Sequence, residues 1–357
     1  MQQVLSTLAN RWKSEEQVSC KTPVTHRLTP GIKRSVVKIL RTPALLSLFA
    51  KDVLAAAYAQ SALRSMSLLE PELIMPQILE KAYSGLETIN ETHRTTAVMN
   101  ALSGISIPLV NGNMWTGGQK HVVPLLELCL PGIDLNDPMK TVCATTFIIS
   151  VIQHIKIGEL SSTPPDTLSH DIPGEDISMA NTADRLPFGI EPGGPVAALS
   201  RAEEAALTRN SSAGFADWVT SFFRRVLSVY ENLPEEGGRR NTTGGKQEES
   251  VLKCLKSTMD VVCLHLSDAL FDLVLKLVFD YATTNARSNS VRAFGQLVAT
   301  LARVRPEATL ARFIPYCTSV IEEELKYGAS SVRTTTTHMA APSDTTLHWS
   351  EQIIACR

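Results

Sequence analysis

The chain has 357 residues, of which 44% are hydrophobic, 20% charged and only 6% aromatic, and its formal net charge at neutral pH is −2. Such a near-neutral composition gives no global sign of nucleic-acid binding or of attraction to an anionic membrane. The longest apolar run, around Val142 to Ile152, is interrupted by Thr145, Thr146 and Ser150 and is too short and too polar to span a bilayer.

Seven cysteines are scattered along the chain, most of them on apolar faces. An odd number without regular spacing is typical of reduced, buried thiols rather than of a disulfide framework. The first residues also carry Lys13, Glu15 and Glu16 soon after a few apolar residues, which does not fit a secretory signal peptide. We therefore expect a protein of the cytosol or the nucleus.

Helical periodicity begins after an N-terminal segment, residues 1–31, that we expect to be poorly ordered. From residue 32 to 157, apolar residues recur at steps of three and four, which predicts HEAT-like helical repeats. Prolines divide this part: we expect Pro43 to separate a first helix from a second at 44–69, and Pro76 to begin a third. A fourth helix is expected to open at Thr92 or His93.

The stretch 119–158 predicts one helical hairpin around which the chain is organised. Pro131 and Gly132 end its first, leucine-rich helix, because proline lacks an N–H and glycine accepts a sharp exit. Ile133 and Leu135 are expected to fill a gap between packed helices. The second helix starts with Asp137 as cap and Pro138 at the first position, and is expected to reach about residue 157.

Residues 158–200 are acidic and rich in proline and glycine, which predicts an exposed insertion loop. HEAT-like repeats are expected to resume over residues 201–357, with a second loop at 234–246. Between the loops, residues 215–230 form a clear amphipathic pattern, and residues 252–281 carry a long apolar stripe that fits one helix or a helix pair. Pro315 is expected to interrupt a later helix.

Together these patterns predict an all-α fold, an α-solenoid of HEAT-like helical hairpins with long insertion loops. The chain has room for roughly six or seven two-helix units of the 40–47 residues typical of HEAT repeats. Each unit would bury its apolar face only against its neighbours.

The sequence predicts no catalytic, cofactor-binding or metal-binding residue. Gly245-Lys246 lacks the remaining glycine and the Ser/Thr of a phosphate loop, so a loop residue pair is favoured. Cys263 lies near His265 but on the apolar stripe, which favours a core cysteine over a metal ligand. Packing or capping is likewise favoured for four histidines near helix ends: His93, His121, His154 and His348.

A group of five arginine side chains between residues 287 and 312 permits two interpretations. On a concave surface these side chains would bind an acidic peptide or a polyphosphate, whereas on a solvated helix face they would form ordinary ion pairs, which is the favoured reading. The residues are Arg287, Arg292, Arg303, Arg305 and Arg312.

Several uncommon strings, in the same order, resemble the large HEAT-repeat proteasome activators of the proteasome activator complex subunit 4 family. The most specific is HVVPLLELCLPGIDLNDPMKT at residues 121–141. Further matching strings lie at residues 95–110, 232–236, 289–293, 328–334 and 343–349. Members of the family are several times longer, so the chain resembles an internal portion of one.

The resemblance implies a helical dome over the proteasome core particle that opens its gate without ATP or ubiquitin, favouring peptides and unstructured or acetylated proteins such as histones. It also implies nuclear and cytoplasmic location, a role in DNA repair, and no enzymatic activity of its own. The core particle would be contacted through parts of the family chain absent here, because Ala355-Cys356-Arg357 lacks the terminal tyrosine motif. Neither a membrane nor a nucleic acid is an expected partner.

A second function stays open on the fold alone: a HEAT-repeat transport receptor or adaptor scaffold. Capture of a transport GTPase or of cargo without core-particle subunits would favour it.

Overall fold

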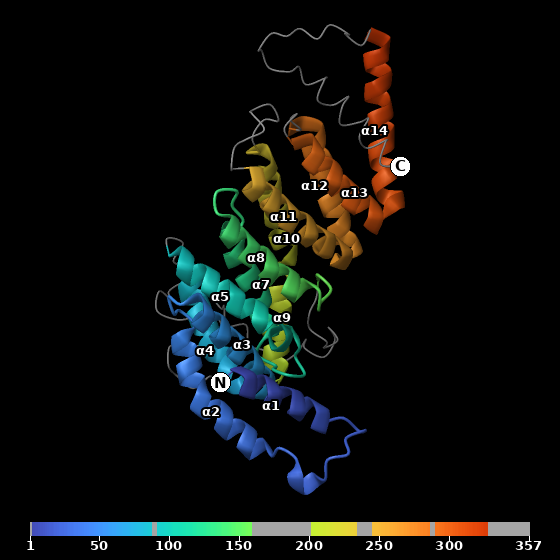
Figure 1. Cartoon of the computed structure of the whole chain (residues 1–357). Coiled ribbons are helices and arrows are strands. Elements are labelled where there is room, and N and C mark those ends of the chain that lie inside the picture. The colour runs from blue at the N-terminus through green and yellow to red at the C-terminus, as the bar shows by residue number, and fades with distance from the viewer. Residues whose placement is uncertain (1, 88–90, 159–200, 234–244, 286–289, 328–357) are drawn as a thin grey trace. The chain divides into compact units, whose positions relative to one another are not determined.

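A computed structural model describes residues 2–87, 91–158, 201–233, 245–285 and 290–327, and the structural statements below concern these residues. Within them, the regular elements are α-helices and three short 3₁₀ helices (Figure 1). The prediction of an all-α fold is therefore confirmed. In the same part of the chain, none of the helices has both the length and the apolar character that crossing a membrane requires.

The helices of the first part of the chain follow one another with short connections. They are α1 (Gln2–Glu15), α2 (Pro30–Ser47), α3 (Val53–Leu69), α4 (Pro71–Glu87), α5 (Thr92–Gly104), α6 (Ser106–Val110), α7 (Val122–Cys129) and α8 (Pro138–Ile152), with the 3₁₀ helices η1 (Val24–His26), η2 (Gln119–His121) and η3 (Leu130–Gly132). The later helices are α9 (Arg201–Ser212), α10 (Phe215–Glu231), α11 (Gly245–His265), α12 (Asp268–Asn285), α13 (Val291–Val304) and α14 (Pro306–Tyr327).

Contacts divide the chain into two compact units: residues 1–132 with 146–215, and residues 133–145 with 216–357. In the first unit α3 is central, because α1, α2, α4 and α5 all pack against it. The packed face of α3 is built largely from small or flexible side chains, which let neighbouring helices approach closely. These include the fully buried Ala62, Leu63 and Met66.

The second unit buries more aromatic side chains. On α10, Trp218 stacks on Phe222 with ring centroids 5.5 Å apart, and both side chains are fully buried. Tyr230 packs edge-on against Phe294 of α13, and α13 also packs against α11, α12 and α14. The amphipathic pattern at residues 215–230 thus forms the predicted helix, with its apolar face buried.

The N-terminal segment differs from the expectation of poor order. Residues 2–15 form α1, which packs on α3 and buries Leu5 completely. Lys33 of α2 also places its ammonium 4.0 Å from the centre of the Trp12 ring. The expectation was wrong for these residues because a helix with few apolar side chains leaves a weak periodic signal, yet tertiary packing stabilises it.

Three prolines lie inside helices rather than ending them: Pro43 in α2, Pro76 in α4 and Pro315 in α14. The predicted helix boundaries at these positions were therefore wrong. A proline removes one backbone hydrogen bond and leaves one carbonyl without its usual donor. Pro43 and Pro315 lie on exposed faces, where water can satisfy that carbonyl, so the packing of the rest of the helix outweighs the loss.

The hairpin prediction is largely confirmed. Pro138 is the first residue of α8, and the Asp137 carboxylate accepts a hydrogen bond from the Lys140 N–H at 3.0 Å. Ile133 is fully buried, while Leu135 is half-buried. However, α8 ends at Ile152, five residues before the expected end.

The long apolar stripe at residues 252–281 belongs to a helix pair, α11 and α12, which are separated at Leu266 and Ser267. The expected loop at 234–246 lies outside the described residues up to position 244, and α11 already begins at Gly245. The expected insertion at 158–200 lies outside them from position 159. The domain boundaries 32–157 and 201–357 therefore stay a prediction.

Candidate functional site

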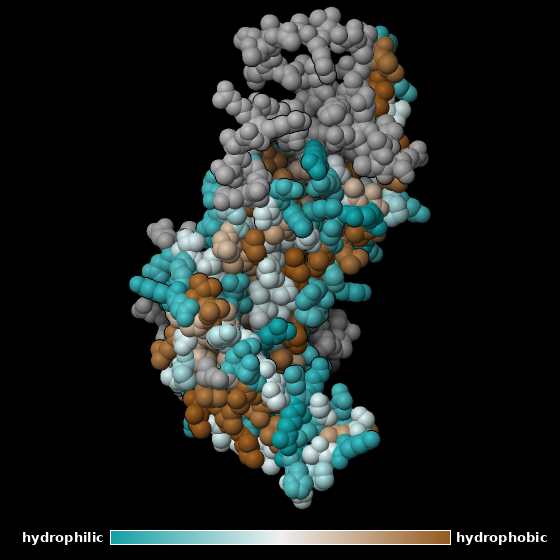
Figure 2. Space-filling view, in the orientation of Figure 1, coloured by the Kyte–Doolittle hydropathy of each residue, from teal (hydrophilic) through white to brown (hydrophobic). Residues whose placement is uncertain are grey.

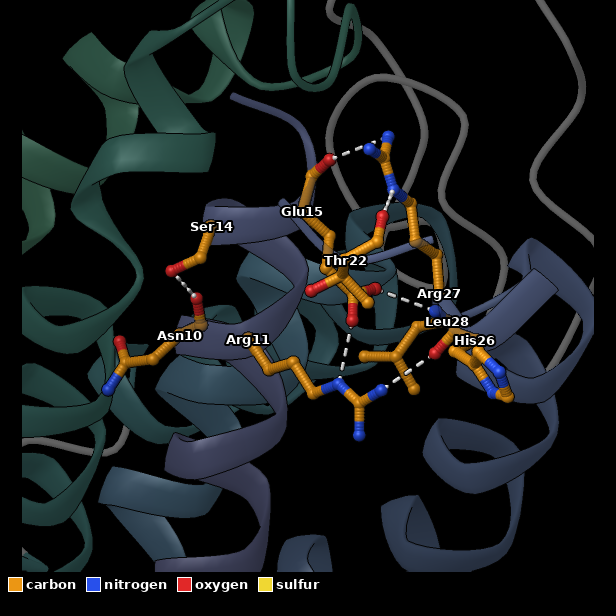
Figure 3. Close-up of polar contacts among 8 residues, drawn as sticks. All are labelled: Asn10, Arg11, Ser14, Glu15, Thr22, His26, Arg27 and Leu28. Atoms are coloured by element: carbon orange, nitrogen blue, oxygen red, sulfur yellow. Dashed lines mark hydrogen bonds and ion pairs between the residues drawn. The ribbon is translucent and has the colours of Figure 1, made fainter. Parts of the chain in front are cut away.

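The Glu15 carboxylate accepts two hydrogen bonds that hold the connection between α1 and α2 (Figure 3). Its Oε1 accepts a hydrogen bond from Arg11 Nε at 2.7 Å, and its Oε2 accepts one from the Leu28 N–H at 2.6 Å. The bond from the Arg11 side chain and that from the Leu28 backbone both hold the pKa of the Glu15 carboxyl below its usual value. The carboxylate therefore fixes where the chain enters α2.

Arg27 organises the loop between these helices from its other side. Its guanidinium donates to the backbone carbonyl oxygens of Thr22 at 2.9 Å and Glu15 at 3.4 Å (Figure 3). It also donates to the Cys20 carbonyl oxygen at 3.3 Å. Hydrogen bonds from Thr22 lower the pKa of the half-exposed Cys20 thiol. Arg27 therefore stabilises the loop through hydrogen bonds to backbone oxygens. These contacts give the loop its shape and do not pair Arg27 with a nucleophilic side chain.

A buried ion pair joins η2 to α9. Lys120 Nζ lies 2.9 Å from Glu204 Oε1, and the side chains of both residues are nearly inaccessible to solvent. Glu204 lies in the first turn of α9, where a negative charge also interacts favourably with the helix dipole. In addition, Ser211 Oγ donates to the Lys120 carbonyl oxygen at 2.7 Å. Contacts with Lys120 therefore hold both the first and the last turn of α9.

The backbone before Lys120 approaches α6 so closely that only glycine fits. A Cβ atom at Gly118 would lie 2.3 Å from the carbonyl oxygen of Leu109, well inside the distance that real atoms allow. Gln119 Nε2 donates to the Val110 carbonyl oxygen at 2.9 Å, which fixes the same approach. These contacts place Lys120 and His121 in the interior.

His121 is buried and shares a hydrogen bond with Tyr83, the Tyr83 hydroxyl oxygen lying 2.9 Å from His121 Nδ1. Burial, and then the neighbouring Lys120 charge, lower the pKa of His121 to about 3. Burial likewise raises the pKa of the Tyr83 hydroxyl. A histidine that stays neutral at physiological pH and is closed off from solvent serves packing, as the sequence favoured, rather than proton transfer.

The other candidates from the sequence are also accounted for by packing. Burial raises the pKa of the Cys263 thiol to about 12, so it stays protonated and is a poor metal ligand. His265 Nδ1 lies 2.8 Å from the Val261 carbonyl oxygen of its own helix. Over the described ranges, no group of three or more His, Cys, Asp or Glu side chains is arranged to hold a metal ion.

Two of the remaining histidines are exposed: His93 in the first turn of α5 and His154 just after α8. His348 and residues 234–244, which precede Gly245, lie outside the described residues. The interpretation of Gly245-Lys246 as a loop pair therefore stays a prediction for the part before Gly245.

The group of five arginines does not converge on one site. Arg303 Nη2 lies 2.9 Å from Asp260 Oδ1, and Arg305 pairs with Asp268 while its guanidinium lies 4.7 Å from the centre of the Phe271 ring. Arg312 lies over the Phe279 ring at 4.9 Å. Arg292 is exposed, and Arg287 lies outside the described residues. For Arg303 and Arg305, the interpretation as helix faces with ordinary ion pairs is confirmed.

The geometry is thus that of a packed helical scaffold, and the comparison with known families agrees. The model for the mid HEAT repeats region of proteasome activator complex subunit 4 matches residues 1–356. The chain belongs to this family. The resemblance seen in the sequence is therefore confirmed, and so is the class of α-solenoid built from HEAT-like helical hairpins.

Individual members of the proteasome activator complex subunit 4 family align over most of the chain. The Xenopus laevis protein of that name is 30% identical over 307 residues, which is 84% of this chain and 15% of the relative. The Homo sapiens protein is 28% identical over 309 residues, with the same two shares. Proteasome activator subunit 4 of Arabidopsis thaliana is 20% identical over 270 residues, or 70% of this chain and 12% of the relative.

The chain therefore spans only 15% of the length of the Xenopus laevis and Homo sapiens relatives. The string that carried the resemblance best, residues 121–141, includes the buried His121 and the capped start of α8. In this chain, these residues serve packing and helix capping. Sequence reasoning missed Lys120, Glu204 and Glu15, because a charged residue gives no sign in the sequence that it will be buried.

Proposed function

We propose that the chain serves as a scaffold region of a proteasome activator that acts on the proteasome core particle. The observation that carries the proposal is the family match over residues 1–356. The interior of the first unit supports it, because the Lys120–Glu204 and Tyr83–His121 pairs are closed off from solvent, as expected of side chains that serve packing. The region would be non-catalytic and would regulate a peptidase.

The finer activity is part of the same proposal. The activator would cap the core particle and open its gate without ATP and without ubiquitin. Its substrates would be peptides and unstructured or acetylated proteins, histones among them, in the nucleus and the cytoplasm and in connection with DNA repair. Packed helical repeats suit this role, because they hold distant contact surfaces at fixed spacing without any chemistry of their own.

A chimera tests the proposal. The region of the Xenopus laevis relative that aligns with this chain is replaced by the chain itself, and the chimera is added to purified core particle with a fluorogenic peptide. We expect peptide hydrolysis to rise as it does with the unaltered relative, in the absence of ATP. A chimera that is folded and monodisperse but leaves hydrolysis at the basal rate would contradict the proposal.

The matched control is the same chimera carrying Gly118→Leu. A leucine side chain cannot fit beside the Leu109 carbonyl oxygen, so this variant distorts the attachment of η2 to α6. We expect it to lose the stimulation. If it stimulated equally well, the packing of this region would not matter for the activity.

A further inference from the structure

α9 differs from the other helices in what it buries. Among the α-helices of the described residues, each of the others has at least one buried apolar side chain, whereas α9 has none. The buried residues of α9 are Glu204, Thr208 and Ser212, which follow one another at steps of four and therefore lie on one side of the helix. The helix thus packs on η2 and α7 largely through polar side chains.

This polar contact does not reflect a shortage of apolar side chains in the first unit. Figure 2 shows a brown area over the stretch that Figure 1 labels α2, where Ile39 and Leu46 are 72% and 74% exposed. The unit therefore leaves apolar side chains in solvent while it buries polar ones beneath α9. The polar character of the contact is a property of α9 itself.

Two contacts with Lys120 attach α9 to η2. Glu204 Oε1 lies 2.9 Å from Lys120 Nζ, and Ser211 Oγ donates to the Lys120 carbonyl oxygen. Glu204 Oε2 is buried and has no hydrogen-bond partner within the described part of the chain. The ion pair must therefore offset the desolvation of two charges with an incomplete set of hydrogen bonds, so it stabilises the docked helix less than buried apolar side chains of the same size would.

A helix attached in this way should separate from its unit as one piece. α9 has 12 residues, a length at which an isolated helix is marginal in water, so it would lose its helical structure on leaving. The following helix, α10, is held by the fully buried Phe215 and Trp218. A Cβ at Gly214 would lie 3.2 Å from Val123 Cγ1, so the turn before α10 packs closely on α7. The opening would therefore be confined to α9.

We propose that α9 is a latch, which detaches from η2 and α7 as one cooperative segment while the rest of the first unit stays folded, and that the Lys120–Glu204 pair sets how often it does so. Elements that move in regulated proteins are drawn from the segments of lowest local stability. Detachment exposes Lys120, so the unit gains a surface that its docked form does not present. A partner or an amine modification that needs this surface would hold the latch open by shifting the equilibrium.

Hydrogen–deuterium exchange of the full 357-residue chain tests the proposal. We expect the amides of residues 205–212 to share one protection factor, lower than that of the α3 amides. In Glu204→Ala the Lys120 ammonium would stay buried without a counter-charge if α9 remained docked. We therefore expect the α9 amides of this variant to lose their protection, whereas those of α3 stay protected.

The double variant Lys120→Met/Glu204→Leu tests the latch in the opposite direction. It replaces two buried charges by apolar side chains that need no counter-charge, so exchange of the α9 amides should slow roughly tenfold. Glu203→Ala is the matched control, because it removes an exposed carboxylate from the same turn of α9. We expect its α9 exchange to stay within about twofold of the unaltered chain.

Labelling with acetic anhydride, read by mass spectrometry, measures the exposure of Lys120 directly. The amine of Lys120 is closed off in the docked form, so its acetylation should be at least roughly tenfold faster in Glu204→Ala. Lys140, a second largely buried lysine, lies on α8 and should keep its rate.

Three results would overturn the inference. The first is an α9 that exchanges no faster than α3 in the unaltered chain, since it would then open only when the whole unit unfolds. The second is a gradient of protection along residues 205–212, which indicates fraying from one end. The third is unchanged exchange of α9 in both Glu204→Ala and the double variant, which would mean that the ion pair does not control the opening.

Discussion

Lys120 and Glu204 are 84 positions apart in the sequence, yet their side chains form a buried ion pair with a separation of 2.9 Å. The two residues stand on either side of residues 159–200 in the chain. The ion pair therefore holds the first turn of α9 against η2 within the first unit.

Removing one partner of this pair should destabilise the first unit strongly. In Glu204→Ala the Lys120 ammonium stays buried without a counter-charge, and we expect the free energy of unfolding to fall by about 3–5 kcal/mol. Urea denaturation followed by circular dichroism measures the change. A fall below about 1 kcal/mol, the range of surface pairs, would mean that the pair is solvated in solution.

The control for this prediction replaces both charges by apolar groups of similar length, Lys120→Met with Glu204→Leu. No charge then remains buried, so the stability should return close to that of the unaltered chain or exceed it. If the double variant were as unstable as the single one, shape rather than charge would explain the loss.

The buried His121 should make stability fall as the solution is acidified. Its pKa is lowered to about 3, whereas an unfolded histidine has a pKa near 6.5. Between these values the unfolded state binds more protons than the folded state, so the stability is fully present above pH 6.5 and is lost as the pH falls. From pH 7.5 to 5 the loss attributable to this residue should be about 2 kcal/mol.

The measurement compares the pH dependence of the unaltered chain with that of His121→Gln, which cannot titrate. We expect the variant to be less stable at pH 7.5 but to have a flatter profile down to pH 5. Tyr83→Phe should keep the steep profile, because it leaves His121 buried. Parallel profiles for His121→Gln and the unaltered chain would show that His121 does not titrate as inferred.

Much of the fold could be predicted from periodicity. Asp137 and Pro138 mark the start of α8 by local chemistry, a carboxylate cap and a residue without an N–H, and local chemistry is visible in a sequence. The prolines were harder. Pro43 and Pro315 do not end their helices, because tertiary packing outweighs one lost hydrogen bond, and packing depends on residues elsewhere in the chain.

The polar interior could not be predicted at all. Glu15 and Glu204 are ordinary acidic residues in the sequence, and only the folded chain brings Leu28 and Lys120 to them. The family, by contrast, could be recognised from uncommon strings even though their residues serve packing. The strings that identified the chain therefore include stabilising residues such as His121, whereas Glu15 and Glu204 lie outside them.

Gly118 and Gly31 should respond in opposite directions to alanine. A Cβ at Gly118 would meet the Leu109 carbonyl oxygen at 2.3 Å, and since that atom belongs to the backbone it cannot turn away. We expect Gly118→Ala to cost about 1–3 kcal/mol, as overpacking does. A Cβ at Gly31, in the first turn of α2, meets nothing within 4 Å, so Gly31→Ala should stabilise by about 0.4–1 kcal/mol.

Thermal unfolding of the two alanine variants measures this difference, and the sign is the decisive quantity. Equal and small effects at both positions would contradict the close approach of Gly118 to α6.

Removing the Glu15 carboxylate should loosen the loop between α1 and α2 without unfolding the helices. In Glu15→Ala the Leu28 N–H loses its acceptor and Arg11 loses its ion pair, so backbone amides of residues 16–28 should exchange with deuterium faster while those of α3 keep their protection. The pKa of Glu15 is lowered, so its contribution is present above the unfolded value of 4.5 and is lost as the pH falls through the folded value. Acidifying the unaltered chain should therefore reproduce the faster exchange of Leu28. Glu16→Ala, at the exposed neighbouring position, should change neither, and unchanged exchange in Glu15→Ala would show that Arg27 alone holds the loop.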